Sequence, residues 1–294
     1  MKLNRASRDW NEAFLQAMKG YGTGVTVSFS MELQHGDDTP QAGLAQRYPS
    51  GDPVWVNTPA LQTNFGPEST AFWQEVHREM ADLMATAGLR PYAQFGEVQW
   101  WYFAAASGMP FYDSYTTTTF QTRYGKPMST IVSQNTDPSG YPDECAFLPE
   151  LIGEFTDALM AYVRQTHADA QFEVLYPPDV NDTALNTLVN FPHTHWTPAK
   201  VDSLKTENFT YTGDRDLNKA LASIELPMQL GFARSQSSHL VGIGDYTTPW
   251  AKEQRLATGE QLDSVVLFAL DQFCLIGYGL PLERGARRSL YMGK

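Results

Sequence analysis

The sequence contains little cysteine, little charge and no long apolar run. Cys145 and Cys274 are the only cysteines among 294 residues, and both have apolar neighbours. We therefore expect two buried free thiols, and no disulfide framework or cysteine-based zinc site. Residues 1–20 carry charges throughout and have no apolar core, so a signal peptide is not expected. No later stretch is long and apolar enough to span a membrane, and the localisation stays open.

The glycine-rich motifs of nucleotide-binding sites are also missing. No Gly-x-Gly-x-x-Gly follows a predicted strand, and no Gly-x-x-x-x-Gly-Lys-Ser/Thr loop occurs. Dinucleotides and nucleotides therefore have little support, and we expect no cofactor. A Gly-x-Ser-x-Gly elbow, which would position a nucleophilic serine, is absent as well.

Acidic residues outnumber basic ones, 33 to 21, which gives a net charge of −12. Nucleic acids and anionic membranes both attract basic surfaces, so neither is an expected partner. A neutral carbohydrate is compatible with this charge. Hydrophobic residues make up 42% of the chain and aromatic residues 13%, enough for a large core or for a stacking surface.

Helical patterns that end near a glycine alternate with short apolar strands along the whole chain. Helices are expected near residues 7–20, 67–87, 112–124, 148–167, 181–190, 216–224 and 250–273. Strands are expected near residues 24–33, 54–57, 91–95, 172–176, 203–209, 227–233 and 274–278, with polar loops at 34–66 and around 235–239. This alternation indicates a parallel sheet covered by helices.

The predicted architecture is an α/β fold, a (β/α)8 TIM-barrel-like single domain over residues 1–294. The barrel is complete, or it is incomplete and irregular. An open doubly wound sheet is the alternative. The chain is either a whole protein or part of a longer polypeptide.

One stretch, Pro91–Phe103, combines a predicted strand with a glutamate and an aromatic run. The strand breaks at Gly96, and Glu97 follows it directly. Active sites of such barrels lie at the C-terminal ends of the strands. Hydrolysis of a glycosidic bond needs two carboxylates, one of them kept protonated by apolar surroundings. Glu97 beside the tryptophans fits the acid, and Glu207, at another predicted strand end, is the candidate nucleophile or base.

Aromatic rings and polar side chains near predicted strand ends are candidates to bind a sugar, since rings stack on sugar faces. The candidate substrate-binding residues are Gln99, Trp100, Trp101, Tyr176, Asp179, His239, Asp245 and Trp250. For each tryptophan, packing in the core is the alternative. Trp10 and Trp73 lie on apolar helix faces and are expected in the core.

Two histidines, His193 and His195, have a spacing that suits a metal ion only if further ligands lie nearby. The sequence names no such ligands, so we expect no metal and treat a metal-dependent hydrolase as a third hypothesis.

The segment Gln94-Phe-Gly-Glu-Val-Gln-Trp-Trp101 resembles the clan-A type of (β/α)8 glycoside hydrolases. The resemblance implies that Glu97 is the acid/base that closes the fourth strand, usually after an asparagine, where this chain has Gly96. It also implies a nucleophilic glutamate at the end of the seventh strand. The strand counted seventh, Pro227–Ala233, has no glutamate, and Glu207 falls on about the sixth.

The leading hypothesis is therefore a glycoside hydrolase with a carbohydrate substrate and Glu97 as general acid/base. The alternative is a non-catalytic carbohydrate-binding or structural barrel module of a larger assembly, for example a viral tail or an extracellular protein.

Overall fold

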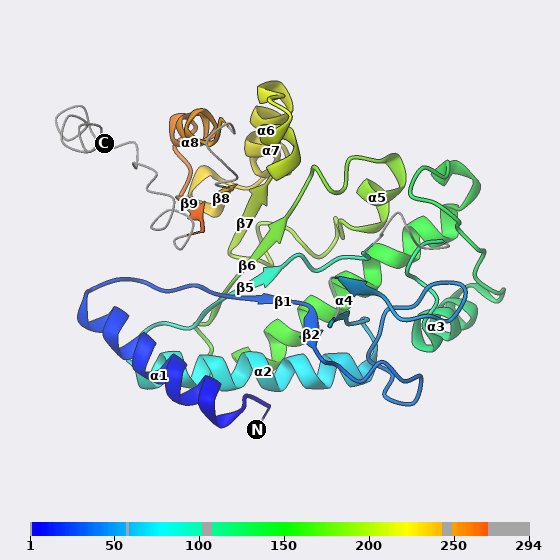
Figure 1. The fold of residues 1–294 in the computed structure, drawn as a ribbon, viewed down its shortest axis with the longest axis horizontal. Helices are drawn as coiled ribbons and strands as arrows, with labels where there is room; N and C mark the ends of the chain where they lie inside the picture. Colours follow the sequence, from blue (N-terminus) through cyan, green and yellow to red (C-terminus); the bar gives the residue numbers. More distant parts are fainter. Residues whose placement is uncertain (1, 57–58, 102–107, 243–248, 270–294) are drawn as a thin grey trace. The chain divides into compact units, whose positions relative to one another are not determined.

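The computed structural model describes residues 2–56, 59–101, 108–242 and 249–269 (Figure 1). The chain divides into two compact units. The first unit comprises Met1–Leu175 and Asn181–Asp202, and the second comprises Tyr176–Val180 and Ser203–Lys294. A single domain over residues 1–294 stays a prediction.

Three parallel strands form the sheet of the first unit. They are β1 (Val27–Ser30), β5 (Tyr92–Gly96) and β6 (Gln171–Tyr176), and β5 lies between the other two. The predicted strands at 24–33, 91–95 and 172–176 are thus confirmed in position. Because β1 pairs directly with β5, Glu97 follows the second parallel strand of the chain and not the fourth.

A small antiparallel sheet occupies the region predicted as a loop at residues 34–66. Its strands β2 (Glu32–Gln34), β4 (Ala60–Gln62) and β3 (Trp55–Val56) are ordered β2–β4–β3. The strand predicted at 54–57 is confirmed as β3. The loop prediction was wrong at β4, because a strand of three residues is too short for a visible alternation pattern.

The helices of the first unit follow the predicted periodicity closely. They are α1 (Arg5–Gly20), α2 (Pro67–Thr86), α3 (Ser114–Tyr124), α4 (Pro142–Arg164) and α5 (Ala184–Val189), with a 3₁₀ helix at Pro138–Gly140. Pro67 begins α2, as its fixed φ favours. Asn4, not Ser7, caps α1, because the Asn4 side chain accepts a hydrogen bond from the backbone N–H of Ser7.

The second unit contains three parallel strands in the order β7 (Ser203–Glu207), β8 (Ser237–Gly242), β9 (Ser264–Phe268). Its helices are α6 (Phe209–Gly213), α7 (Leu217–Gln229) and α8 (Trp250–Gly259), with a 3₁₀ helix at Arg234–Gln236. The strand predicted at 203–209 is confirmed as β7.

Three sequence predictions for this unit were wrong. Residues 227–233 form the end of α7 and a turn, since the apolar run continues the helix through Pro227. The polar loop predicted at 235–239 contains the start of β8, where Ser238 lies within hydrogen-bonding distance of Ser203 and Ser264. The helix predicted at 250–273 ends at Gly259, and β9 follows. The strand predicted at 274–278 and Cys274 lie outside the described residues.

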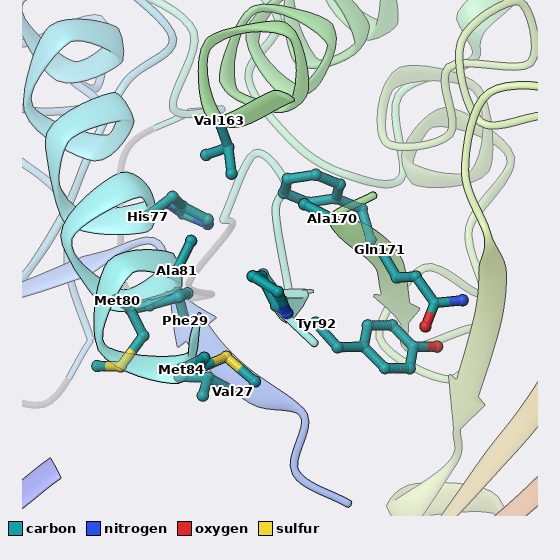
Figure 2. A pocket seen from close by; sticks show the side chains of 13 residues that line it. Val27, Phe29, His77, Met80, Ala81, Met84, Tyr92, Val163, Ala170 and Gln171 are labelled. Atoms are coloured by element: carbon teal, nitrogen blue, oxygen red, sulfur yellow. The ribbon is translucent and has the colours of Figure 1, made fainter. Parts of the chain in front are cut away.

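The core of the first unit contains a histidine, His77 of α2, which Figure 2 shows in the space between α2 and α4. Its ring packs against Phe29 and Phe95, and the Nδ1 atom lies 2.8 Å from the carbonyl oxygen of Trp73. The cavity beside it has about 10 Å³ of water-accessible space and is lined almost entirely by apolar groups. A water needs two to four polar partners, so this space suits no water and His77 is held neutral.

Two further predictions can be compared with the described residues. Cys145 is half-buried and not disulfide-bonded, so the thiol is less enclosed than expected. No helix in the described ranges has the length and apolar character needed to cross a membrane.

We predict that His77 weakens the fold in acid. Burial lowers the pKa of His77 to about 4, against 6.5 for a free imidazole. The unfolded chain therefore binds a proton more readily, and stability falls as the pH drops from 6.5 towards 4. The loss is about 3 kcal/mol at pH 4. Urea unfolding of the wild type and of His77→Phe, from pH 7 to pH 4, measures it. An equal loss in both proteins would contradict the prediction.

Candidate functional site

The predicted acid, Glu97, lies directly after β5 in an unusual backbone conformation. Its φ is +52°, in the left-handed region that residues with a β-carbon rarely adopt. The preceding Gly96 is confined by β1, because a β-carbon at Gly96 would lie 3.0 Å from the backbone oxygen of Phe29. A side chain at this position, such as the asparagine of clan-A glycosidases, would therefore be crowded and would require β1 to shift slightly.

The cavity next to Glu97 is small. It has about 40 Å³ of water-accessible space and is lined by Ser30, Met31, Glu32, Gln62, Gly96, Glu97 and Trp101. Pockets that bury small organic ligands are typically 300–1,000 Å³. Within the first unit, this cavity is therefore too small to enclose a sugar ring, although two of the predicted strand-end acids, Glu32 and Glu97, line it.

Four buried amide side chains fix the segment that follows Glu97. Gln46 donates to the Gln99 carbonyl at 2.9 Å and accepts from the Trp101 N–H at 3.1 Å. Asn190 accepts from the Trp100 N–H at 2.7 Å and donates to Asn181, which donates to the Gln99 side chain. Gln99 is thus enclosed in a structural network, and its role in binding a sugar stays a prediction.

The tryptophans predicted to form a stacking surface lie largely inside the protein. Trp100 is 1% exposed, packs edge-on against Phe65 and donates its indole N–H to the Leu148 carbonyl. Trp250 is buried against Val241. Both tryptophans are core residues, because their rings point inward from the end of a strand and the start of a helix. Trp101 is half-buried beside the small cavity.

Trp10 and Trp73 were both predicted in the core, and the structure separates them. Trp73 is buried and donates its indole N–H to Thr63, which confirms the prediction. Trp10 is 63% exposed on α1, so that prediction was wrong. The apolar stripe that contains Trp10 faces away from the side of α1 that carries the buried Leu15.

In the second unit, the candidates His239 and Glu207 are both buried. The Nδ1 atom of His239 lies 2.9 Å from the Thr206 hydroxyl, and its Nε2 atom lies 2.8 Å from a carboxylate oxygen of Glu253. All three groups are fully enclosed. The hydrogen bonds from Thr206 through His239 to Glu253 therefore join β7, β8 and α8. These three side chains are closed to a substrate.

The remaining candidates of the second unit have structural surroundings as well. Asp179 accepts hydrogen bonds from the backbone N–H groups of Val180 and Thr210, at 3.0 and 2.7 Å. Tyr176 is buried, and burial raises its pKa above the usual value. Asp245 lies outside the described residues. The stacking and binding roles proposed for Tyr176 and Asp179 stay predictions.

His195 is held by two carboxylates on α4. Its Nδ1 atom lies 2.7 Å from Asp157, and its Nε2 atom lies 3.0 Å from Glu150. Both ring nitrogens are engaged, whereas His193 is exposed. Burial raises the pKa of Glu150, but hydrogen bonds from Thr194 and His195 outweigh it and leave that pKa below its usual value. The ring rests on the helix at Gly153, where a β-carbon would come within 2.2 Å of it.

The hypothesis of a metal-dependent hydrolase finds no support in this part of the chain. Among the described residues, no group of three or more His, Cys, Asp or Glu side chains converges as a metal site. His195 instead holds residues 191–200 against α4 through its two hydrogen bonds.

Sequence reasoning missed the partners that give these sites their structural character. Glu253 is one, since an acid in the first turn of a helix is usually exposed. Gln46, Asn181 and Asn190 are others. The sequence gives only a weak signal for the role of these amides, because amides scattered over distant loops show no pattern until the fold brings them together.

A comparison with protein families finds one match over most of the chain. The family model described as "Non-contractile tail sheath protein TIM barrel" matches residues 1–278. The chain belongs to this family. The predicted α/β, TIM-barrel-like fold is therefore confirmed, with six parallel strands in the described residues. The resemblance to clan-A glycoside hydrolases, and the glycosidase function and carbohydrate substrate drawn from it, were wrong.

Solved structures support the fold alone. The catalytic domain of a β-amylase from Paenibacillus polymyxa matches with a TM-score of 0.65 and 10% identity, covering 90% of this chain and 80% of that one. A 2-naphthoyl-CoA reductase matches at 0.48, with 11% identity over 90% of this chain and 39% of the reductase. An exo-β-agarase matches at 0.47, with 9% identity over 87% and 37%. No curated protein sequence matches the chain.

We predict that Gly96→Ala destabilises the protein by about 1–3 kcal/mol, because the new β-carbon presses on the β1 backbone. Gly24→Ala is the matched control, since no atom lies within 4 Å of a β-carbon there. Urea unfolding of both variants gives the two values. The steric argument fails if Gly96→Ala is as stable as the control.

We also predict that the effect of Gly153→Ala on stability changes sign when the His195 ring is removed. In the wild type, Gly153→Ala displaces the His195 ring and destabilises the chain. In a His195→Ala background the clash is gone, and the same change stabilises α4 by about 1 kcal/mol through helix propensity. A double-mutant cycle measured by thermal or urea unfolding yields the coupling energy. Additive effects of the two substitutions would show that the ring does not rest on this glycine.

Proposed function

We propose that the chain is a structural barrel module of a non-contractile sheath of a virus tail, and that its work is assembly with further copies. The observation that carries this proposal is the family match over residues 1–278. It corresponds to the structural module that the sequence left open as the alternative to an enzyme.

The geometry of the strand ends supports the same reading. Glu97 lies beside a cavity of about 40 Å³, and the amides of Gln46 and Asn190 hold the segment after it. His239 is enclosed between Thr206 and Glu253. Among the candidate residues, Gln99 and His239 therefore have side chains that join separate segments of the fold.

A sheath consists of many copies in repeated contact. Contacts between two different surfaces of the same chain produce rings when they close and helical filaments when they do not. A module of this kind is therefore expected to present at least two complementary surfaces, and to associate increasingly with concentration.

We predict that the purified chain forms rings or tubes in a concentration-dependent way. Sedimentation velocity over a dilution series, followed by electron microscopy of the largest species, measures this. A chain that stays monomeric at the highest attainable concentration, alone or with the other tail proteins, would contradict the proposed function.

A further inference from the structure

Helix α1 carries an exposed apolar stripe on the side that does not pack on the protein. The stripe consists of Ala6, Trp10, Ala13, Phe14, Ala17 and Tyr21, all of which are exposed. Their spacing of three and four residues places them along one face of the helix. Leu15, on a different face, is the buried residue that joins α1 to Met80, Leu83 and Met84 of α2. Figure 1 shows α1 beside α2.

Two rings of the stripe pack against each other. The rings of Trp10 and Phe14 are stacked, 5.1 Å apart and 8° from parallel. Trp10 is 63% exposed, Phe14 37% and Tyr21 79%. Together they leave roughly 400 Å² of aromatic surface in water, as large as patches that are often functional. We call this surface the α1 stripe.

The same unit contains an open groove that can receive such rings. It lies between α2 and α4 and has a volume of about 340 Å³. Its lining is mixed: Phe65, Pro67, Ala71, Tyr115, Phe155 and Ala158 are joined by the polar residues Thr70 and Gln74. Phe65 and Phe155 form its buried floor. Glu154 stands among its lining residues. A volume of this size lies in the range of sites that bury apolar groups.

A chain cannot place its α1 stripe in its own groove. Leu15 fixes α1 on the Met80–Met84 end of α2, with the stripe turned outward. The groove begins at the other end of α2, near Pro67, on the side that faces α4. The occupant of the groove must therefore come from another molecule.

Charge favours a second copy of this chain as that molecule. Residues 1–20 hold four basic and two acidic side chains, whereas the rest of the chain holds 17 basic and 31 acidic ones. The segment around the α1 stripe is therefore locally basic in an otherwise acidic protein. Arg5 has a 94% exposed side chain at the start of α1, beside Asp9. The basic segment of one copy is attracted by the net negative charge of the next copy.

The area of the contact fits an assembly better than a free dimer. Stable pairs bury about 800 Å² on each partner, roughly twice the aromatic surface of the stripe. Such a contact is weak alone and gains strength when several copies hold one another in a ring or tube. It joins two different surfaces, which is the kind of contact that propagates.

We propose that the α1 stripe of one copy docks in the α2–α4 groove of the next, with Trp10 and Phe14 inserted beside Ala71 and Ala158. The inference rests on the proposed function, since it names the surfaces through which the module assembles.

The test compares matched variants in the assembly measurement. Trp10→Ser and Phe14→Ser remove the rings, and Val132→Ser is the control at another exposed apolar residue, 67% exposed. Ala71→Lys fills the groove and repels Arg5, and Ala85→Lys is the control on the exposed side of the same helix. Trp10→Ser and Ala71→Lys are expected to raise the concentration needed for assembly at least tenfold, with both controls within twofold of the wild type. Melting temperatures show whether each variant is folded.

A cross-link identifies the occupant directly. Benzoylphenylalanine is placed at position 14, and assemblies are formed from a mixture of ¹⁴N- and ¹⁵N-labelled chains before illumination. Mass spectrometry is expected to find position 14 joined to peptides that contain residues 65–74 or 154–158, with mixed isotope pairs. Cross-links confined to one isotope, or to other peptides, overturn the docking.

The outcomes separate the two proposals. If the wild type assembles and the stripe and groove variants assemble equally well, the docking is wrong and the structural function stands. If only one of the two surfaces matters, the pairing of stripe with groove is wrong. If the wild type never assembles, the structural function is wrong and the docking is wrong with it.

Discussion

The amide hydrogen bonds at the end of β5 determine what the strand-end segment can do. Gln46, Asn181 and Asn190 bond the Gln99 carbonyl, the Gln99 side-chain oxygen and the N–H groups of Trp100 and Trp101. The buried side-chain nitrogen of Gln99 is left without a partner in the described residues. Buried polar groups of this kind are costly when left unsatisfied, so the network holds the segment in one conformation. With the backbone fixed, Trp100 is directed into the core against Phe65. An aromatic run that looks like a binding surface in the sequence becomes part of the scaffold.

The contact between β1 and β5 imposes a second constraint at the same place. A β-carbon at Gly96 would be crowded by the Phe29 carbonyl, and the next residue, Glu97, has a left-handed backbone conformation. Together these features place a glutamate at the end of a barrel strand, where enzymes of this fold carry their catalytic groups. A glutamate at this position is not enough to form a sugar-binding site, because the cavity beside Glu97 is far smaller than a sugar-binding pocket. The fold is shared with a β-amylase domain at 10% identity, and function does not follow from a fold.

The alternation of helices and strands could be predicted because it rests on local periodicity. The stripe on α2, the strand at β6 and the strand at β7 all follow from spacing, and they are where the sequence places them. The short strand β4 was missed, since three residues show no clear alternation. The prediction of a strand at 227–233 was wrong because it took Pro227 as the start of a new element. A proline in the last turn of α7 leaves the helix intact.

The surroundings of the candidate site residues were harder to predict than the elements. Whether Trp10 or Trp100 is exposed depends on which face of each element meets another, and that is decided by contacts distant in sequence. The same applies to His239, whose partner Glu253 lies on α8. The sequence predicted a buried tryptophan on α1 and a stacking surface at the strand ends. The structure shows exposed aromatic residues on α1 and enclosed ones at the strand ends. The surface available for recognition is a helix face, which suits contacts between proteins better than the binding of a small molecule.

Hydrogen–deuterium exchange on dilute and assembled protein tests this account most directly. The account predicts that peptides covering residues 5–20 and 65–74 gain protection on assembly. Peptides that cover the Glu97–Trp101 segment are predicted to exchange slowly in both states, because their amides are bonded within the unit. Unchanged protection of α1 on assembly, together with fast exchange at Glu97–Trp101 that slows only when a ligand is added, would contradict it.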